Sequence, residues 1–333
     1  MSNNDADRSP LERRVRIALV SLTTVAVGGA AIWWFASRPP SGPIVRLAIV
    51  PAAYYLPLMV AHDQKLFERH GFRSTIESFN SNTDMINSLI KGDTDVSALG
   101  SGGAFPLEAI SPGKVRFVYG QNSSSYSLVV PKSSPIQNIE DLRGKRIGTW
   151  QSPTPRAFLH LILDSRIGPK AFEINPVDFK YLNQNLKSGA VDALLNTDVY
   201  TQAAIESGEA RYLSRNPMEE FVLKPFFNGG GLVLRDIAQR KPDIARVVDA
   251  VMSEAVTYIQ LHEADARKSM TRHIEKLSET VALAAPLDRF VQLPHVDLNG
   301  AQRVADLLSD LPPDEQTGKK LLPRRIDVVP MFR

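Results

Sequence analysis

Several loops of the sequence carry small or polar side chains that could hold a ligand, and each follows a run that predicts a β-strand. Ser101, Gly102 and Gly103 follow the strand-like run 95–99. Small residues here would let backbone N–H groups approach an anion at the start of a helix. In open α/β sheets, ligands bind beyond the carboxyl ends of strands, where loops enter helices. The other candidate loops contribute Tyr54 and Tyr55, then Gln151, Ser152 and Thr154, and finally Asn196 and Asp198.

Two further positions qualify this list of candidate ligand contacts. Asn228 precedes three glycines and is a candidate for a hinge or for the binding cleft. Arg156 could pair with an oxyanion, but as a helix residue it is expected to be solvated. The same residue types also form helix N-caps and turns, so a purely structural role stays open for every candidate. Asp198 is the acidic candidate, and its carboxylate would suit a substrate amine and repel a simple anion.

Patterns typical of catalysis or metal binding are missing from the sequence. His262-Glu263 begins a metalloprotease-like string, but Ala266 stands at its fifth position, and the histidines show no metal-ligand spacing. The run 100–103 starts a dinucleotide fingerprint, yet Phe105 replaces its third glycine. Neither a Walker A loop nor a nucleophile elbow occurs. We therefore predict a protein that is not an enzyme, with no catalytic residue, no metal and no cofactor.

Composition predicts a folded protein with two lobes. The 333 residues are 43% hydrophobic and 23% charged, which excludes wholesale disorder and a polytopic membrane protein. This length exceeds the size at which single cores stop growing. The net charge of +3 arises at the chain ends, because residues 319–333 alone carry five basic groups against one acid. We therefore expect no nucleic-acid partner, and the absence of cysteine excludes disulfides and a lipobox-type lipid anchor.

Residues 17–37 form an uncharged, mostly apolar run that could cross a bilayer, since a helix of this length spans roughly 30 Å. Arginines at 13, 14 and 16 precede it, so the positive-inside rule leaves 1–16 as a cytoplasmic n-region. We predict a periplasmic protein anchored in the inner membrane by Ile17–Ser37, with 38–43 as a linker. A cleaved signal peptide stays open, since small residues occur at Gly28–Ala31.

The part after the linker alternates strand-like and helix-like runs. Strand-like runs at 44–50 and 73–78 flank a helix-like run at 58–69, and a second such series follows the turn-rich stretch 131–135. Strands separated by helices predict mainly parallel sheets. No internal repeat is visible by eye.

Four motifs carry a resemblance to a known family. Leu58–Phe72 (LMVAHDQKLFERHGF) resembles the first-helix signature of nitrate/sulfonate/taurine-type substrate-binding proteins of ABC importers, with Lys65 where that family usually has Gly. Ile90–Val96 is similar to the family's L-x-x-G-x-x-D-V/A, Ile139–Gly148 to I-x-D-L-K-G-K-x-I-G, and Leu186–Ala193 to L-x-x-G-x-V-D-A. In this order and at these intervals the matches form a specific set, and the resemblance covers about 44–234. Asp95 and Asp192 within them are expected to bond turn backbone rather than ligand.

The resemblance implies an α/β fold of the periplasmic-binding-protein type II class, with two lobes that are each a mainly parallel sheet flanked by helices. Lobe 1 would comprise 44–126 and 228–333, and lobe 2 would comprise 127–227. A hinge would close the lobes over a small solute such as a sulfonate or taurine-like compound. Asp198 stands where the family often has Glu followed by Pro, and Val199 replaces that Pro.

The implied partners are an ABC permease and its ATPase subunits, with a monomeric ectodomain. Two alternatives stay open. One is a membrane-tethered sensor or assembly partner that uses a binding-protein-like ectodomain. The other is an enzyme on the same fold, such as a thiamine pyrimidine synthase, although that family carries a cysteine cluster that this chain lacks.

Overall fold

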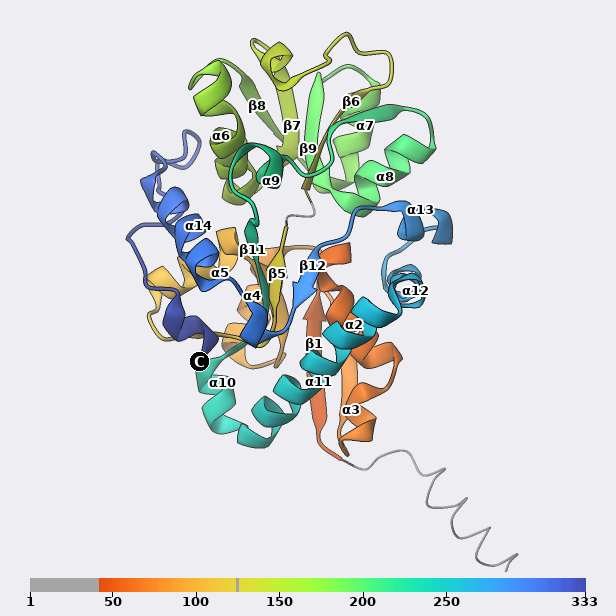
Figure 1. Ribbon diagram of the computed structural model, residues 1–333, viewed down its shortest axis with the longest axis vertical. Helices are drawn as coiled ribbons and strands as arrows, with labels where there is room; N and C mark the ends of the chain where they lie inside the picture. Colours follow the sequence, from red (N-terminus) through yellow and green to blue (C-terminus); the bar gives the residue numbers. More distant parts are fainter. Residues whose placement is uncertain (1–41, 124–125) are drawn as a thin grey trace, which may run out of the picture.

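The computed structural model describes residues 42–123 and 126–333. The predicted n-region, the membrane or signal segment 17–37 and most of the linker lie outside the described residues. Within the two described ranges, no helix is long and apolar enough to span a bilayer. The described elements form two groups, one above the other in Figure 1, which we call lobe 1 (below) and lobe 2 (above).

Lobe 1 is built on two sheets that meet at β1. β1 (Ile44–Ile49) and β2 (Arg73–Ser78) pair in parallel, and an isolated parallel bridge joins Leu47 of β1 to Val96. The larger sheet has the strand order β12-β5-β11-β3, with β4 also pairing with β11. Its strands are β3 (Ser97–Gly100), β4 (Val115–Phe117), β5 (Gly120–Asn122), β11 (Phe227–Leu234) and β12 (Arg289–Val291).

Helices cover the lobe 1 strands. The bounds are η1 (Ala53–Tyr55), α2 (Leu56–Asp63), α3 (Leu66–Arg69), α4 (Asn82–Lys91), α5 (Ser101–Ile110), α10 (Arg235–Arg240), α11 (Pro242–Leu261), α12 (Glu263–His273), α13 (Glu279–Ala284), η4 (Leu293–His295), α14 (Leu298–Asp310) and η5 (Val329–Phe332). In α11, buried residues at helical spacing (Ile244, Val248, Val251 and Ala255) form the face turned to the core. The single helix expected at 58–69 is two helices, because Lys65 adopts a left-handed conformation with φ of 52°. The residue that replaces the family's Gly therefore keeps a backbone geometry that favours Gly.

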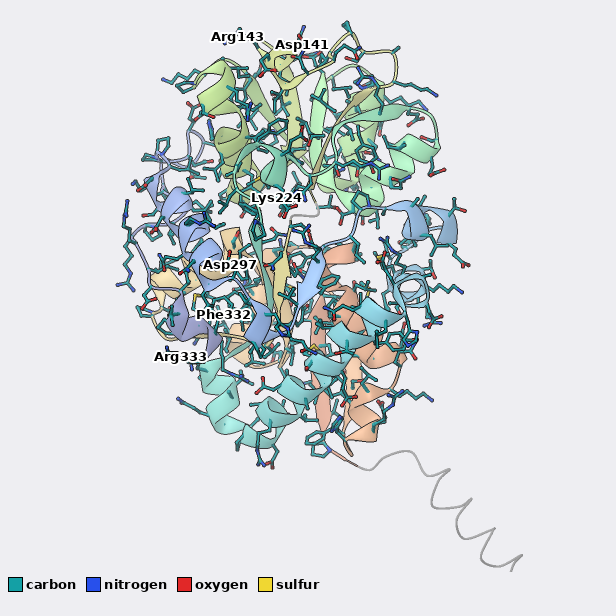
Figure 2. The ribbon with its side chains drawn as sticks, viewed as in Figure 1. Asp141, Arg143, Lys224, Asp297, Phe332 and Arg333 are labelled. Atoms are coloured by element: carbon teal, nitrogen blue, oxygen red, sulfur yellow. The ribbon has the colours of Figure 1, made fainter. Side chains whose placement is uncertain are left out.

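Lobe 2 is a five-stranded sheet in the order β10-β6-β9-β7-β8. Its strands are β6 (Tyr126–Pro131), β7 (Arg146–Trp150), β8 (Glu173–Val177), β9 (Ala193–Thr197) and β10 (Ala210–Ser214). The helices are η2 (Ile139–Leu142), α6 (Pro153–Ile167), η3 (Phe179–Tyr181), α7 (Leu182–Lys187), α8 (Asp198–Glu206) and α9 (Pro217–Phe221). The chain passes from β5 to β6 into this lobe, and it returns from β10 through α9 to β11 (Figure 1). Lys224 lies on the returning segment, between the two lobes (Figure 2).

The expectation of mainly parallel sheets is wrong. Parallel pairing is confined to β1–β2, β7–β8, β7–β9 and the bridge at Leu47, in the described part of the chain. β11 is antiparallel to β3, β4 and β5, and β6 is antiparallel to both β9 and β10. The reason is the connectivity of the chain. β6 and β11 carry the chain from one lobe to the other, so each enters its sheet from the end opposite to that at which the strands of the βα units begin.

The basic C-terminal segment is part of the folded core. Leu322, Val328 and Met331 are fully buried. Phe332 stacks on Phe117 of β4 with 4.9 Å between ring centroids, at the end of the chain shown in Figure 2. Arg324 donates a hydrogen bond to the carbonyl of Ala109 at 2.8 Å. Residues 311–333 therefore close over lobe 1, which the charge of this segment did not predict.

Candidate functional site

Two of the predicted site residues, Thr154 of lobe 2 and Gly102 of lobe 1, are in direct contact. The hydroxyl of Thr154, in the first turn of α6, donates a hydrogen bond to the carbonyl of Gly102 in α5 at 3.0 Å. A Cβ atom on Gly102 would overlap the Thr154 side chain, so only glycine allows this approach. In a second contact between the lobes, the Tyr200 hydroxyl of lobe 2 donates a hydrogen bond to the carbonyl of Pro51 in lobe 1, also at 3.0 Å. The two lobes are thus in contact through the loops that follow β1, β3, β7 and β9.

Ser101 is a buried polar residue at this boundary. It is the first residue of α5, directly after β3, and it has no exposed surface. Its hydroxyl has no hydrogen-bond partner in the ranges that the structure describes. Because the first N–H groups of a helix lack intrahelical partners, Ser101 presents a hydrogen-bonding group beside backbone donors.

Aromatic rings from both lobes gather near these loops. In lobe 1, the rings of Tyr54 and Tyr55 in η1 lie edge to face with centroids 5.3 Å apart. In lobe 2, Tyr126 of β6 stacks on Trp150 of β7 at 5.4 Å. The amide of Gln121 in β5 donates to the carbonyl of Tyr54 at 2.8 Å and fixes that turn.

Each lobe also places a buried carboxylate here. Asp198, the first residue of α8, is 1% exposed, and Asp288, just before β12, is 4% exposed. The amide nitrogen of Asn228, in β11, donates to Asp288 Oδ2 at 3.4 Å. Its amide oxygen, on an equally buried side chain, has no hydrogen-bond partner among the described residues. Asp288 was not predicted, because it lies in the C-terminal part of the chain that carries no family motif.

Burial and nearby acids raise the pKa values of two tyrosines at this boundary. Burial raises the pKa of Tyr54, and Tyr119, Tyr55 and Asp288 raise it further. Burial also raises the pKa of Tyr126, with Asp288 and then Asp198 as the charged neighbours that add to the shift. The ring of Tyr126 therefore lies near the acid of each lobe, and we call the group of residues around it the interlobe cluster. It consists of Tyr54, Tyr55, Tyr119, Tyr126, Trp150, Asp198, Asn228 and Asp288.

Other predicted positions have more ordinary surroundings. Gln151 is exposed, Ser152 is the N-cap residue of α6 without a side-chain cap bond, and Gly103 is half-buried. The Asn196 side chain accepts a hydrogen bond from the N–H of Thr197 at 2.8 Å, as in a turn. These four positions lie at or just after the carboxyl ends of β3, β7 and β9, outside the residues named as the interlobe cluster.

The expectation that Arg156 is solvated is wrong. Its guanidinium makes two hydrogen bonds to the Asp314 carboxylate, at 2.6 and 3.0 Å, and the two side chains are only 7% and 10% exposed. This pair joins α6 of lobe 2 to the C-terminal segment. Beside it, a cavity of about 280 Å³ lies between α6 and residues 311–321. In the described part of the chain, no group of three or more His, Asp or Glu side chains could hold a metal ion.

The fold is that of the periplasmic binding proteins. The structure resembles the alkanesulfonate-binding protein SsuA from Xanthomonas axonopodis pv. citri bound to MOPS, with a TM-score of 0.68 and 21% identity over 87% of this chain and 98% of that one. It also resembles the periplasmic aliphatic sulphonate binding protein SsuA from Escherichia coli (TM-score 0.67, 18% identity, 88% and 100%). The nitrate-binding protein NrtA from Synechocystis PCC 6803 matches at 0.58 and 12% identity over 73% and 70%.

The family follows from the sequence itself. The family model described as NMT1/THI5 like matches residues 52–223, just over half of the chain, and the chain belongs to this family. The resemblance drawn from the four motifs is thereby confirmed. Among curated proteins, no match is found. At the identities of the solved structures, their likeness shows the fold, and their names describe binding proteins rather than enzymes.

Proposed function

We propose that this chain is a solute-binding protein that holds a small organic solute between its two lobes and delivers it to the permease and ATPase of an ABC transporter. The observation that carries the proposal is the direct contact between Thr154 and Gly102, beside the buried polar groups of Ser101 and Asn228. A protein whose ligand loops meet across two lobes can enclose a solute and release it by opening. Sulfonates and taurine-like compounds are the first solutes to test, because binding proteins of similar fold are named for sulfonates.

The proposal assigns 44–126 and 228–333 to lobe 1 and 127–227 to lobe 2, except that Tyr126 begins β6 of lobe 2 and Phe227 begins β11 of lobe 1. The two connecting segments form the hinge. Opening would break the Thr154–Gly102 and Tyr200–Pro51 hydrogen bonds and the Arg156–Asp314 ion pair. The proposed ligand contacts are the predicted residues of the loops that meet there: Tyr54, Tyr55, Ser101, Gly102, Gly103, Gln151, Ser152, Thr154, Asn196, Asp198 and Asn228.

The proposal also places the described part of the chain in the periplasm. Binding proteins of similar fold are named as periplasmic. The apolar run 17–37 would carry the chain across the inner membrane, as an anchor or as a signal sequence. The mass of the native protein distinguishes the two, since a cleaved chain would begin near Ala31.

Ligand-induced stabilisation tests the proposal. We expect the melting temperature of the full-length protein to rise with the logarithm of solute concentration for at least one member of a panel of sulfonates, taurine, pyrimidines and small carboxylates. Thr154→Trp places an indole against Gly102 and should abolish the rise, whereas Thr280→Trp, at an exposed position in α13, should preserve it. If no small solute stabilises the protein and a partner protein is recovered instead, the sensor alternative replaces this one.

A further inference from the structure

The geometry points to a solute that carries a protonated nitrogen with N–H bonds, held between Asp198 of lobe 2 and Asp288 of lobe 1. The inference rests on the proposed function and specifies its substrate class. It predicts that simple anions are poor ligands, although binding proteins of similar fold are named for alkanesulfonates and nitrate.

The two carboxylates occupy opposite sides of the boundary between the lobes. Asp198 is the first residue of α8 and lies at the N-terminal end of that helix. Asp288 precedes β12 at the edge of the lobe 1 sheet. Both are almost fully buried, so water screens their charges weakly and any charged group between them interacts strongly with both. A cation placed there would join the lobes in the closed state.

The side chain of Asn228 independently favours a ligand that donates hydrogen bonds. Its amide nitrogen donates to Asp288, which fixes the orientation of the amide and directs the oxygen elsewhere. That oxygen is buried and has no partner among residues 42–123 and 126–333. A buried acceptor without a donor is costly, and a ligand N–H group would satisfy it. An ammonium or amidinium group provides both the charge for the carboxylates and the N–H bonds for Asn228.

The aromatic rings of the interlobe cluster favour the same kind of ligand. The faces of Tyr and Trp rings attract cations, and five such residues come from η1, β6, β7 and the segment before β5. Burial is the main cause of the raised pKa values of Tyr54 and Tyr126; Asp288 adds to both shifts and Asp198 adds to that of Tyr126, so the two acids lie close to these rings. An alkanesulfonate without an amine would meet like charge on both sides.

Arginines near these loops already have other partners. Arg156 pairs with Asp314, and Arg289, next to Asp288, pairs with Glu219. The Arg215 guanidinium lies 4.5 Å from the centroid of the Tyr212 ring. A ligand anion would have to compete for these groups, whereas a zwitterion such as taurine could place its amine between the carboxylates and its sulfonate near the N-terminus of α5.

Calorimetric titration of the full-length protein with matched probes tests the inference. We expect benzylammonium and taurine to bind, ethanesulfonate to show no heat of binding, and benzyltrimethylammonium, which lacks N–H bonds, to bind about tenfold more weakly than benzylammonium. Asp198→Asn and Asp288→Asn should each weaken benzylammonium binding about tenfold or more. Asp243→Asn, which removes an exposed acid in α11, should leave it unchanged.

Circular dichroism shows whether each variant is folded. If the aspartate variants are not, Asn228→Leu replaces them: it should weaken benzylammonium and leave benzyltrimethylammonium unaffected, because only the first uses the amide oxygen. Binding of ethanesulfonate by the wild-type protein, or unchanged amine affinity in the folded variants, overturns the inference. If only uncharged solutes from the wider panel bind, the receptor function stands and this inference fails. If no solute binds at all, both fail.

Discussion

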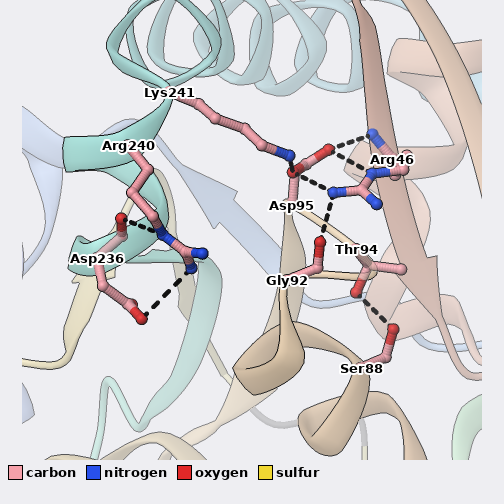
Figure 3. A network of polar contacts seen from close by, with 8 residues as sticks. All are labelled: Arg46, Ser88, Gly92, Thr94, Asp95, Asp236, Arg240 and Lys241. Atoms are coloured by element: carbon pink, nitrogen blue, oxygen red, sulfur yellow. Dashed lines mark hydrogen bonds and ion pairs between the residues drawn. The ribbon is translucent and has the colours of Figure 1, made fainter.

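Arg46 in β1 and Arg146 in β7 make the same hydrogen bonds, each within its own lobe. The backbone N–H of Arg46 donates to Asp95 at 3.0 Å, and its guanidinium donates to both carboxylate oxygens and to the carbonyl of Gly92. Arg146 does the same with Asp192 and the carbonyl of Gly189. We call each set an Arg–Asp clamp; Figure 3 shows the one in lobe 1.

The two clamps differ in burial and in charge. The Asp95 side chain is 0% exposed, and Lys241 of α10–α11 adds a second ion pair at 2.7 Å (Figure 3). The Asp192 side chain is 30% exposed and pairs with Arg146. Burial alone would raise the pKa of Asp95, but the hydrogen bonds from Arg46 and Lys241 lower it below its usual value. The bond from Arg146 lowers the pKa of Asp192.

The comparison explains the recurring G-x-x-D motif. In each clamp the glycine lies at the C-cap of a helix or directly after it, and its carbonyl accepts a hydrogen bond from the arginine guanidinium. The aspartate three residues later binds the same arginine, which lies in a strand. Both acids therefore have structural roles, as predicted, but their partner is an arginine 49 or 46 residues away rather than the turn backbone. The acids that face the other lobe, Asp198 and Asp288, lie outside this motif.

The largest effect is expected from Asp95→Asn. The change leaves Arg46 and Lys241 without their buried carboxylate, which we expect to lower the free energy of unfolding by about 3 kcal/mol. This loss is at the low end of the range for breaking a buried ion pair, because the side chains of Arg46 and Lys241 are 34% and 37% exposed. Urea denaturation followed by circular dichroism measures it, and a loss no larger than that of Asp192→Asn would contradict the role of burial.

We expect an intermediate loss of stability from Asp314→Asn, which removes a carboxylate that joins the two lobes. Burial raises its pKa, but hydrogen bonds from Arg156 and Thr317 more than offset this, and the pKa is about 2. The stabilisation is therefore complete above about pH 4, the unfolded pKa, and is lost as the pH falls through the folded pKa. Asp314→Asn should cost about 1–2 kcal/mol at neutral pH after allowance for solvent screening.

Thermal melts of wild type and Asp314→Asn between pH 7 and pH 2 check this prediction. The difference in stability between the two proteins should shrink on acidification below about pH 4. A constant difference across this range would show that the carboxylate charge is not what Arg156 recognises.

The smallest effect is expected from Asp192→Asn in lobe 2. Its carboxylate and the Arg146 guanidinium are both partly in water, where ion pairs contribute little and salt screens them. The loss of unfolding free energy should be a minor fraction of that for Asp95→Asn. Parallel urea titrations of the two variants provide the comparison, and equal losses would mean that the clamps act through geometry alone.

Features that depend on residues close together in the chain could be predicted from the sequence. The family, the alternation of strands and helices, and the loops at which lobes meet could all be read from motifs and periodicity. The antiparallel entry of β11 could not, because its partners β3 and β5 lie more than a hundred residues earlier. The Arg156–Asp314 pair, whose members are 158 residues apart, was missed for the same reason. Asp288 was missed because it lies in the part of the chain that carries no family motif. At Lys65 the sequence did indicate the backbone geometry. The family usually has Gly at this position, and the Lys65 backbone is left-handed.

Enclosure of a small solute by the two lobes, at the loops where they meet, can be measured in solution. The most direct measurement is the melting temperature of the full-length protein as a function of taurine concentration, in the wild type and in Thr154→Trp. We expect the melting temperature to rise with the logarithm of concentration in the wild type and to stay constant in the variant. A melting temperature that rises equally in both proteins would contradict this expectation.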